Sequence, residues 1–402
     1  MQIHTVPHQK PGRRWTDSME IISAPSSSSS TRLLCLRPED KDLYEQFAQT
    51  LIPIGEFFDG LNRQGVTAQP DEFGTVEVSR LSIVGASTLP GLNEAKCVCI
   101  DSPSEISDHA SHSTLYVFKG ADFSAWLERK HEKRPWNVYK RALYSEHSLK
   151  EELMVLCTMP PHPNIIPRPP ILVSTPTSPE RICGFLQPFR AKQTISEQVD
   201  LVNKKRVRIP LLIKAKWCLG IAEGILHTHR VAKTFHMDMK PANVLVEDDN
   251  SVRIIDWQQQ GMCRATHPPE ATLGFNPKIQ KIVDKMRLDQ NGQPIVIFAP
   301  HTGTWPEEGL RDAYVRWKAE NSRGLEAAEL FMAARTFWHV LDQRGETIDP
   351  TIWSKESVDI PESWRKIVEA CLIEDPAKRP ALGTVVEFWR KQVEASPSNT
   401  GF

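Results

Sequence analysis

A group of polar residues surrounds two short apolar runs in the middle of the 402-residue chain. The runs, within residues 244–255, are predicted to be strands, and the acidic turn between them predicts a hairpin. Asp238 and Asn243 precede the hairpin and Asp256 follows it, so the hairpin returns their side chains to one region. Lys240 adds a positive charge there. Two carboxylates, an amide and an ammonium suit the binding of metal and phosphate, as phosphoryl transfer requires.

The same stretch resembles the catalytic core of the protein kinases. HMDMKPAN stands where a kinase has its catalytic loop, and IIDWQ stands at the Asp-Phe-Gly element. Residue type and spacing agree at six positions: His236, Asp238, Lys240, Pro241, Asn243 and Asp256. The resemblance implies that Asp238 orients or deprotonates the acceptor hydroxyl and that Lys240 steadies the transferred phosphoryl group. Asn243 and Asp256 would hold Mg²⁺, and His236 would brace the loop. The alternative is a surface hairpin with a polar turn.

Two residues of an upstream strand and helix are candidates for holding the nucleotide. Residues 114–119 resemble the kinase strand that ends on the lysine pairing with nucleotide phosphates, which makes Lys119 the candidate. A lysine at the end of an edge strand is the alternative. Residues 137–159 predict a helix in which Glu152 aligns with the glutamate that ion-pairs with this lysine, and Glu151 is the next choice. The string HPNI after this helix carries the same resemblance.

The adenine is expected to meet the chain near the end of a further strand. Residues 181–188 read as this strand, and it leads into the segment that resembles the hinge between two kinase lobes. Backbone groups of Leu186 and Gln187 would then contact the adenine. With the metal-binding pair, this resemblance implies ATP and Mg²⁺ as cofactors.

The chain departs from the kinase pattern at several points. Residues 101–113 contain no glycine, although a kinase has here a glycine-rich loop whose backbone approaches the phosphates. Trp257 and Gln258 replace the Phe and Gly of Asp-Phe-Gly, and Met237 replaces an arginine that usually pairs with a phosphorylated activation segment. Regulation by such phosphorylation is therefore less expected. The IDWQQQG string resembles a divergent fungal group of kinase-like proteins.

Downstream residues resemble structural elements of the large kinase lobe. Glu329 stands where an acidic residue fixes the catalytic-loop backbone. Arg379, within CLIEDPAKRP, would form a buried ion pair with the glutamate that closes the activation segment. We expect that glutamate to be Glu307 or Glu308, near the end of the long segment 261–324.

By the resemblance, which covers about residues 80–392, the chain has an α+β, two-lobed protein-kinase-like fold. Its expected parts are a disordered N-terminal tail (1–31), an N-terminal extension (32–80), a small β-rich N-lobe (81–188), a larger, mainly helical C-lobe (189–392) and a C-terminal tail (393–402). The first tail, rich in proline, charge and serine, cannot bury enough surface to offset its ordering entropy. The extension, with a helical pattern interrupted at Pro53, is either an added subdomain or a brace on the N-lobe.

The composition is that of a globular protein with polar ends. Hydrophobic residues make up 40% of the chain and the formal net charge is −1, so no general attraction to nucleic acid or membrane is indicated. Eight scattered cysteines without a Cys-x-x-Cys pair indicate reduced thiols. No apolar run reaches the length of a membrane span, and the first residues are too polar for a secretory signal. We expect an intracellular, cytoplasmic protein.

Three functions are consistent with these patterns. The first is a protein serine/threonine kinase, since every member of the minimal chemical set is present. The second is an ATP-binding pseudokinase scaffold, because the glycine loop is missing and Gln258 replaces a hinge glycine. The third is a small-molecule phosphotransferase, although Lys240-Pro241 and residues 371–380 favour a protein acceptor. We expect the first; neither the protein substrate nor the oligomeric state is indicated.

Overall fold

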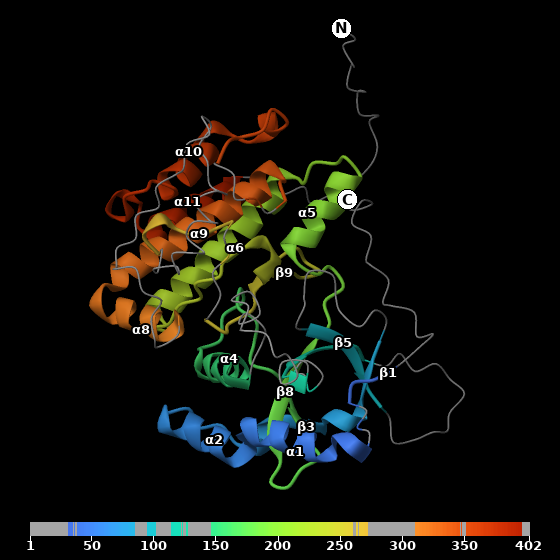
Figure 1. The fold of residues 1–402 in the computed structure, drawn as a ribbon. Coiled ribbons are helices and arrows are strands. Elements are labelled where there is room, and N and C mark those ends of the chain that lie inside the picture. Colours follow the sequence, from blue (N-terminus) through green and yellow to red (C-terminus); the bar gives the residue numbers. More distant parts are fainter. Residues whose placement is uncertain are drawn as a thin grey trace, which may run out of the picture.

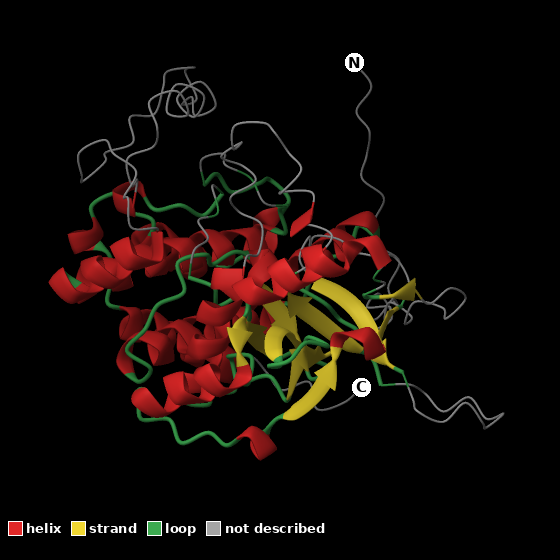
Figure 2. Ribbon diagram, turned by 60° about the horizontal axis from the view of Figure 1, so that its bottom comes forward, coloured by secondary structure: helices red, strands yellow, loops and turns green. Residues whose placement is uncertain are grey.

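A curled β-sheet and a set of packed helices make up the structure, a computed structural model (Figure 1). It describes residues 31–34, 36, 38–84, 95–101, 114–121, 123, 126–127, 146–259, 263, 265–271, 310–345, 347 and 351–395. Within these ranges the fold is α+β, with the strands gathered on one side of the molecule (Figure 2). The expected tails, apart from residue 31 and residues 393–395, and most of the segment without glycine lie outside the described residues.

The eight-stranded sheet carries a predicted site residue near its centre. Its order is β1-β4-β5-β6-β8-β7-β3, and β2 pairs with β8 outside this path. The strands are β1 (Thr31–Arg32), β2 (Ile52–Pro53), β3 (Gly74–Glu77), β4 (Leu81–Ile83), β5 (Ala95–Ile100), β6 (Tyr116–Gly120), β7 (Ile171–Ser174) and β8 (Arg181–Pro188). Neighbours are antiparallel except β3 and β7. Lys119 lies opposite Phe185, with β5 on its other side, so the edge-strand alternative is wrong.

The N-terminal extension shares this sheet. Its helical pattern breaks at Pro53 as predicted, giving α1 (Lys41–Thr50) and α2 (Ile54–Arg63) on either side of β2. Strands β2 and β3 pair with β8 and β7, and α2 packs against α4 (Glu146–Thr158). Both α1 and α2 lie along the sheet in Figure 1. The extension is therefore built into the sheet that carries Lys119 and braces it.

The remaining helices form the other part of the molecule. They are α5 (Ile195–Lys204), α6 (Leu211–Arg230), α8 (Leu310–Glu320), α9 (Ser322–Asp342), α10 (Glu362–Cys371) and α11 (Leu382–Ala395). Short 3₁₀ turns occur at Pro38–Asp40, Pro70–Glu72, Val78–Arg80, Pro241–Asn243, Pro269–Ala271, Ser357–Asp359 and Pro376–Lys378. Among these described helices, none is both long and apolar enough to cross a membrane. Helix α6 packs on α9 and α11, and Trp217 of α6 is fully buried.

The predicted hairpin consists of β9 (Val244–Val246) and β10 (Val252–Ile254), paired antiparallel. Two glycines of α6 let this hairpin lie directly on the helix. A Cβ at Gly220 would come within 2.6 Å of a Val252 methyl carbon, and one at Gly224 within 2.6 Å of an Ile254 methyl carbon. Glycine lowers helix propensity by about 1 kcal/mol per residue, and this close contact accounts for its use here. The hairpin, and the polar residues on either side of it, are thereby held close against α6.

Candidate active site

The loop before β9 holds three of the predicted site residues against one another. Lys240 donates from Nζ to Asp238 Oδ2 at 2.8 Å, and Asn243 donates from Nδ2 to the same oxygen at 3.0 Å. Asn243 also donates to the Asp238 backbone carbonyl at 2.8 Å. The other carboxylate oxygen, Asp238 Oδ1, is buried and has no hydrogen-bond partner among the described residues. Asp238 is thus held firmly in place with one acceptor atom left for an external donor.

A second group joins the sheet, helix α4 and the end of the hairpin. Lys119 Nζ lies 3.0 and 2.8 Å from the two carboxylate oxygens of Glu152, and it also donates to Asp256 Oδ1. The expected ion pair between Lys119 and Glu152 is therefore present. Glu151, the other candidate, turns to Arg311 instead, with 2.7 Å between its Oε2 and the guanidinium.

Burial and charge act in opposite directions on these groups. Burial alone would lower the pKa of Lys119, but the charges of Asp256 and Glu152 raise it above its ordinary value. Burial alone would raise the pKa of Asp256, and Lys119 lowers it instead. In the same way Asp238 raises the pKa of Lys240 against the effect of burial. The site is therefore a cluster of charged groups at neutral pH.

His236 connects the catalytic loop to the end of β10. Its Nε2 lies 2.8 Å from the Ile255 carbonyl, and its Nδ1 lies 3.2 Å from the Asp238 amide nitrogen. The ring therefore donates at Nε2 and accepts at Nδ1. The Ile255 amide donates to the Asn243 carbonyl at 3.0 Å, which closes the connection between the two sides of the hairpin. His236 braces the loop in the manner that the sequence predicted.

Glu329 of α9 supports the backbone of the loop before β9, as predicted. Its Oε1 accepts from the backbone amides of His236 and Met237 at 2.6 and 2.5 Å, and its Oε2 lies 2.5 Å from His229 Nε2. Glu329 is fully buried, which would raise its pKa, but His229 holds the pKa below the ordinary value. A buried charge with this many donors fixes the loop backbone.

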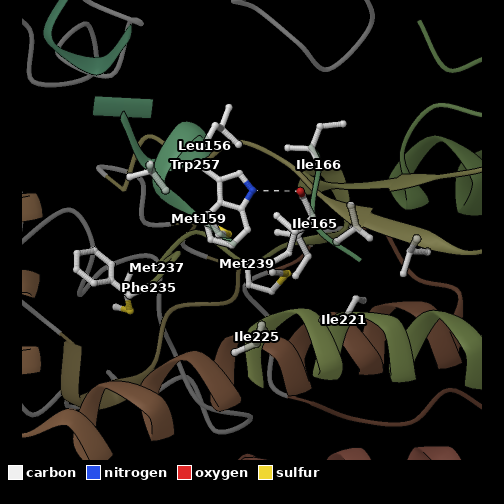
Figure 3. Packing of buried hydrophobic residues seen from close by; sticks show 14 of the residues in the cluster. Leu156, Met159, Ile165, Ile166, Ile221, Ile225, Phe235, Met237, Met239 and Trp257 are labelled. Atoms are coloured by element: carbon white, nitrogen blue, oxygen red, sulfur yellow. Dashed lines mark hydrogen bonds between the residues drawn. The ribbon is translucent and has the colours of Figure 1, made fainter. Parts of the chain in front are cut away.

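Trp257 fills the space behind the charged cluster. Its side chain is fully buried, and its indole donates to the Ile254 carbonyl at 3.1 Å. In Figure 3, Leu156 lies above the ring and Met159 lies below it, with Met239 of the loop before β9 further below. Its backbone amide donates to Glu152 Oε1 at 3.1 Å. The ring thus fills an apolar space in the core, and the backbone of Trp257 fixes the neighbouring Asp256 relative to α4.

Three residues at the site have a strained backbone. Met237, Asp256 and Gln259 have φ values of 58°, 68° and 58°, in the left-handed region that non-glycine residues rarely occupy. Each such residue costs on the order of 1 kcal/mol and persists only where its surroundings hold it. Here the holding contacts are the Met237 amide to Glu329, the Asp256 carboxylate to Lys119, and the Gln259 side chain to the chain before the loop.

Gln259 is a site-supporting residue that the sequence analysis missed. Its Nε2 donates to Thr234 Oγ1 at 2.8 Å and to the Phe235 carbonyl at 2.5 Å, and its Oε1 accepts from Arg311 Nε at 3.2 Å. It is nearly fully buried. The available signal was the run of three glutamines, residues 258–260, that begins two positions after Asp256. The sequence analysis considers only the first of them, Gln258. Gln258 itself is partly exposed, with its amide nitrogen 3.5 Å from Asp256 Oδ2.

The predicted adenine contact is wrong for Leu186. This residue is fully buried and pairs with β6 on one side and β7 on the other, so its backbone groups face the neighbouring strands. Gln187 lies opposite Val117 and therefore on the same face of the sheet as Lys119. Its Nε2 donates to the Pro167 carbonyl at 2.9 Å.

The ion pair of Arg379 is present, but its partner differs from the expected one. The guanidinium is fully buried and donates from both terminal nitrogens to Glu270, at 2.8 Å from the NH2 nitrogen to Oε2. The expected partners, Glu307 and Glu308, lie outside the described residues, and the Glu270 contact overturns their assignment. Glu270 follows Asp256 by only 14 positions. The segment that begins at Asp256 and ends at the Arg379–Glu270 ion pair is therefore short. The Pro-Pro-Glu string that ends on Glu270 was the signal in the sequence.

Comparisons with known proteins agree on one class of protein. No family model matches the chain. It is similar to cyclin-dependent kinase F-1 of Oryza sativa subsp. japonica, at 29% identity over 105 residues, which is 25% of this chain and 22% of that protein. A probable serine/threonine-protein kinase of Dictyostelium discoideum is 22% identical over 194 residues, 47% of this chain and 10% of that protein. The dual specificity mitogen-activated protein kinase kinase dSOR1 of Drosophila melanogaster is 21% identical over 236 residues, 53% of this chain and 57% of that protein.

These similarities support a relation to the protein kinase superfamily and a protein-kinase-like function in general. The matched part spans from 10% to 57% of the lengths of these three relatives. A relation to a fungal group in particular is not among these findings.

Proposed function

We propose that the chain is a protein kinase with a two-lobed fold, which transfers a phosphoryl group from ATP to serine or threonine hydroxyls of a protein. The observation that carries this proposal is the state of the Asp238 carboxylate. One oxygen is held by Lys240 and Asn243, and the other is buried with no partner among the described residues. A buried acceptor without a donor is costly, and a substrate hydroxyl is the donor that phosphoryl transfer would supply.

Each residue around Asp238 has a role in this proposal. The acceptor hydroxyl donates to Asp238 Oδ1, which orients its oxygen and receives its proton as the oxygen bonds to the γ-phosphorus of ATP, the bond from that phosphorus to the bridging oxygen breaks, and ADP leaves. Lys240, already bonded to Asp238 Oδ2, places a positive charge beside the transferred group. His236 and Glu329 keep the loop in shape and touch neither reactant.

The residues near Asp256 fit a magnesium ion and a nucleotide. Mg²⁺ prefers oxygen ligands and is usually bound through one or two carboxylates together with substrate phosphates and water. Asp256 offers Oδ2, since Lys119 occupies Oδ1. Asn243 offers its side-chain amide oxygen Oδ1, since its Nδ2 is directed to Asp238. Lys119, fixed between two carboxylates, is the cation for the nucleotide phosphates. When bound, Mg²⁺ would neutralise charge on those phosphates.

The base of the nucleotide belongs next to the end of β8. Gln187 lines the face of the sheet that carries Lys119, and its Oε1 is buried with no partner among the described residues. The residues after Pro188 would then supply the backbone groups that contact the base, because those of Leu186 face the neighbouring strands.

A nucleotide-binding scaffold without turnover is the second candidate. Lys119 takes one oxygen of Asp256, and the amide of Gln258 lies near the other at 3.5 Å. Both oxygens of the metal-binding carboxylate thus have a neighbouring donor, which disfavours a tightly held metal ion.

Phosphate transfer from labelled ATP, with Mg²⁺ and a generic protein substrate, tests the proposal. The parent is compared with Asp238→Asn and with Asp248→Asn, the same change at an exposed position of the hairpin turn. We expect Asp238→Asn to reduce transfer about a hundredfold or more while ATP still stabilises the fold against heat, and Asp248→Asn to have no effect. Equal transfer by the parent and Asp238→Asn would contradict the role of Asp238. A parent that ATP stabilises but that transfers nothing would support the scaffold.

A further inference from the structure

A single arginine joins three elements around the site. Arg311, on α8, contacts Glu151 of α4 at 2.7 Å from a terminal guanidinium nitrogen to Oε2. The same guanidinium donates from Nε to Gln259 Oε1 at 3.2 Å. The Glu151 carboxylate is mostly buried, with 14% of its side chain exposed, against 30% for Arg311. The contact is therefore more shielded from water than a typical surface ion pair.

The position of Glu151 gives this contact its significance. The next residue, Glu152, holds Lys119 and the amide of Trp257. Successive residues of a helix point about 100° apart around its axis, so contacts at both carboxylates fix the rotation of α4 as well as its distance from the loop. Among the described residues, the Arg311 contact thus adds a second polar link, beside the Glu152 contacts, between this turn of α4 and the segment that follows Asp256.

Helix α8 is a firm base for Arg311. Tyr314 is fully buried and packs edge-on against Phe235, with 5.8 Å between ring centroids. Lys318 donates from Nζ to the Thr234 carbonyl at 2.7 Å. The residues that α8 contacts, Thr234 and Phe235, are also those that Gln259 bonds. Arg311, Gln259 and the start of the catalytic loop therefore form one connected unit.

We propose that Arg311 is a positioning residue that holds α4 in the orientation in which Glu152 pairs with Lys119. This inference rests on the proposed phosphoryl transfer for its effect on activity, but its effect on α4 is measurable in the absence of activity.

Hydrogen exchange of the α4 amides, in the full chain, tests the proposal directly. In Arg311→Ala we expect exchange in α4 to rise about tenfold or more, as for the loss of a hydrogen bond to a charged group, while α9 exchange stays unchanged. Arg311→Lys should restore part of the protection, and the double variant Arg311→Glu with Glu151→Arg should restore most of it. Glu320→Ala, at an exposed position of the same helix, is the control and should leave α4 exchange unchanged.

Phosphate transfer is measured on the same variants. We expect Arg311→Ala to lower kcat about tenfold with a smaller change in the KM of the protein substrate, since the described contacts of Arg311 are with Glu151 and Gln259 and not with Asp238 or Lys240. Unchanged α4 exchange in Arg311→Ala would overturn the proposal. So would a folded charge-swapped variant that exchanges as fast as Arg311→Ala. A parent without transfer, but with the expected exchange differences, would overturn the proposed function and leave the role of Arg311 supported.

Discussion

The side chains of Lys119 and Asp256, 137 positions apart in the chain, are joined by a hydrogen bond between ammonium and carboxylate. Glu152 holds the same lysine from α4. This single cation therefore ties the sheet, helix α4 and the segment after the hairpin together, and its removal affects the fold as well as the site.

Lys119→Met should destabilise the protein by about 2–4 kcal/mol, because it leaves two largely buried carboxylates without their shared cation. Urea unfolding measures the free energy of unfolding, and Lys366→Met, at a lysine side chain that is 71% exposed, is the control. Equal stability of the two variants would show that Lys119 contributes nothing to the fold.

Asp256→Asn should abolish the part of ATP binding that depends on Mg²⁺, because it removes the anionic oxygen that the metal ion requires. The measurement is the shift in Tm with ATP, taken with Mg²⁺ and with EDTA. We expect the parent to gain stability from Mg²⁺ and the variant to give the same curve in both conditions. A gain of the same size in the variant would exclude Asp256 as a metal ligand.

Glu329→Ala should cost about 3 kcal/mol, since it leaves the buried amides of His236 and Met237 without their acceptor and opens a cavity. Urea unfolding is again the measurement, with Glu320→Ala at an exposed position of α8 as control. Glu329→Gln, which keeps an oxygen acceptor, should fall between the parent and the alanine variant. A loss no larger than that of the control would rule out the supporting role of Glu329.

The stability of the protein should fall with pH between about 6.5 and 4 partly because of His339. This residue of α9 is fully buried, and burial together with the charge of Arg335 lowers its pKa to about 4. A folded-state pKa below the unfolded value means that the unfolded chain binds the proton more readily in this window. The stabilisation is therefore complete above about pH 6.5 and is lost as the pH falls, by about 3 kcal/mol in all.

His339→Leu isolates this contribution. The free energy of unfolding is measured by urea at several pH values for parent and variant, and their difference should shrink toward acid pH. Carboxylates elsewhere titrate in both proteins and cancel in the difference. Parallel curves for the two proteins would show that His339 does not titrate as stated.

Much of the local structure around the site follows from short patterns in the sequence. The hairpin 244–254 is visible as two apolar runs with an acidic turn, and α6 is visible as an apolar stripe with a period near 3.6. The spacing of Asp238, Lys240 and Asn243 is that of a short loop, and the structure shows these three bonded to one another.

The errors concern contacts between distant segments. The sequence predicts that Glu307 or Glu308 pairs with Arg379, whereas the structure shows Glu270 in that position. The long segment contains several glutamates, and the sequence does not show which of them reaches Arg379. Leu186 was misplaced because the end of a strand is clear in a sequence only to within a residue or two.

The sequence by itself determined which helices and strands form and which charged residues flank the hairpin, since residue spacing and hydrophobic period are local properties of the chain. Only the tertiary structure decided which groups meet across it: Lys119 with Asp256, Arg379 with Glu270, and Arg311 with both Glu151 and Gln259. The physical reason is that an ion pair acts over a few ångströms and leaves no periodic trace in the sequence. Its partners are set by how helices and strands pack, and that packing depends on apolar contacts summed over the whole core.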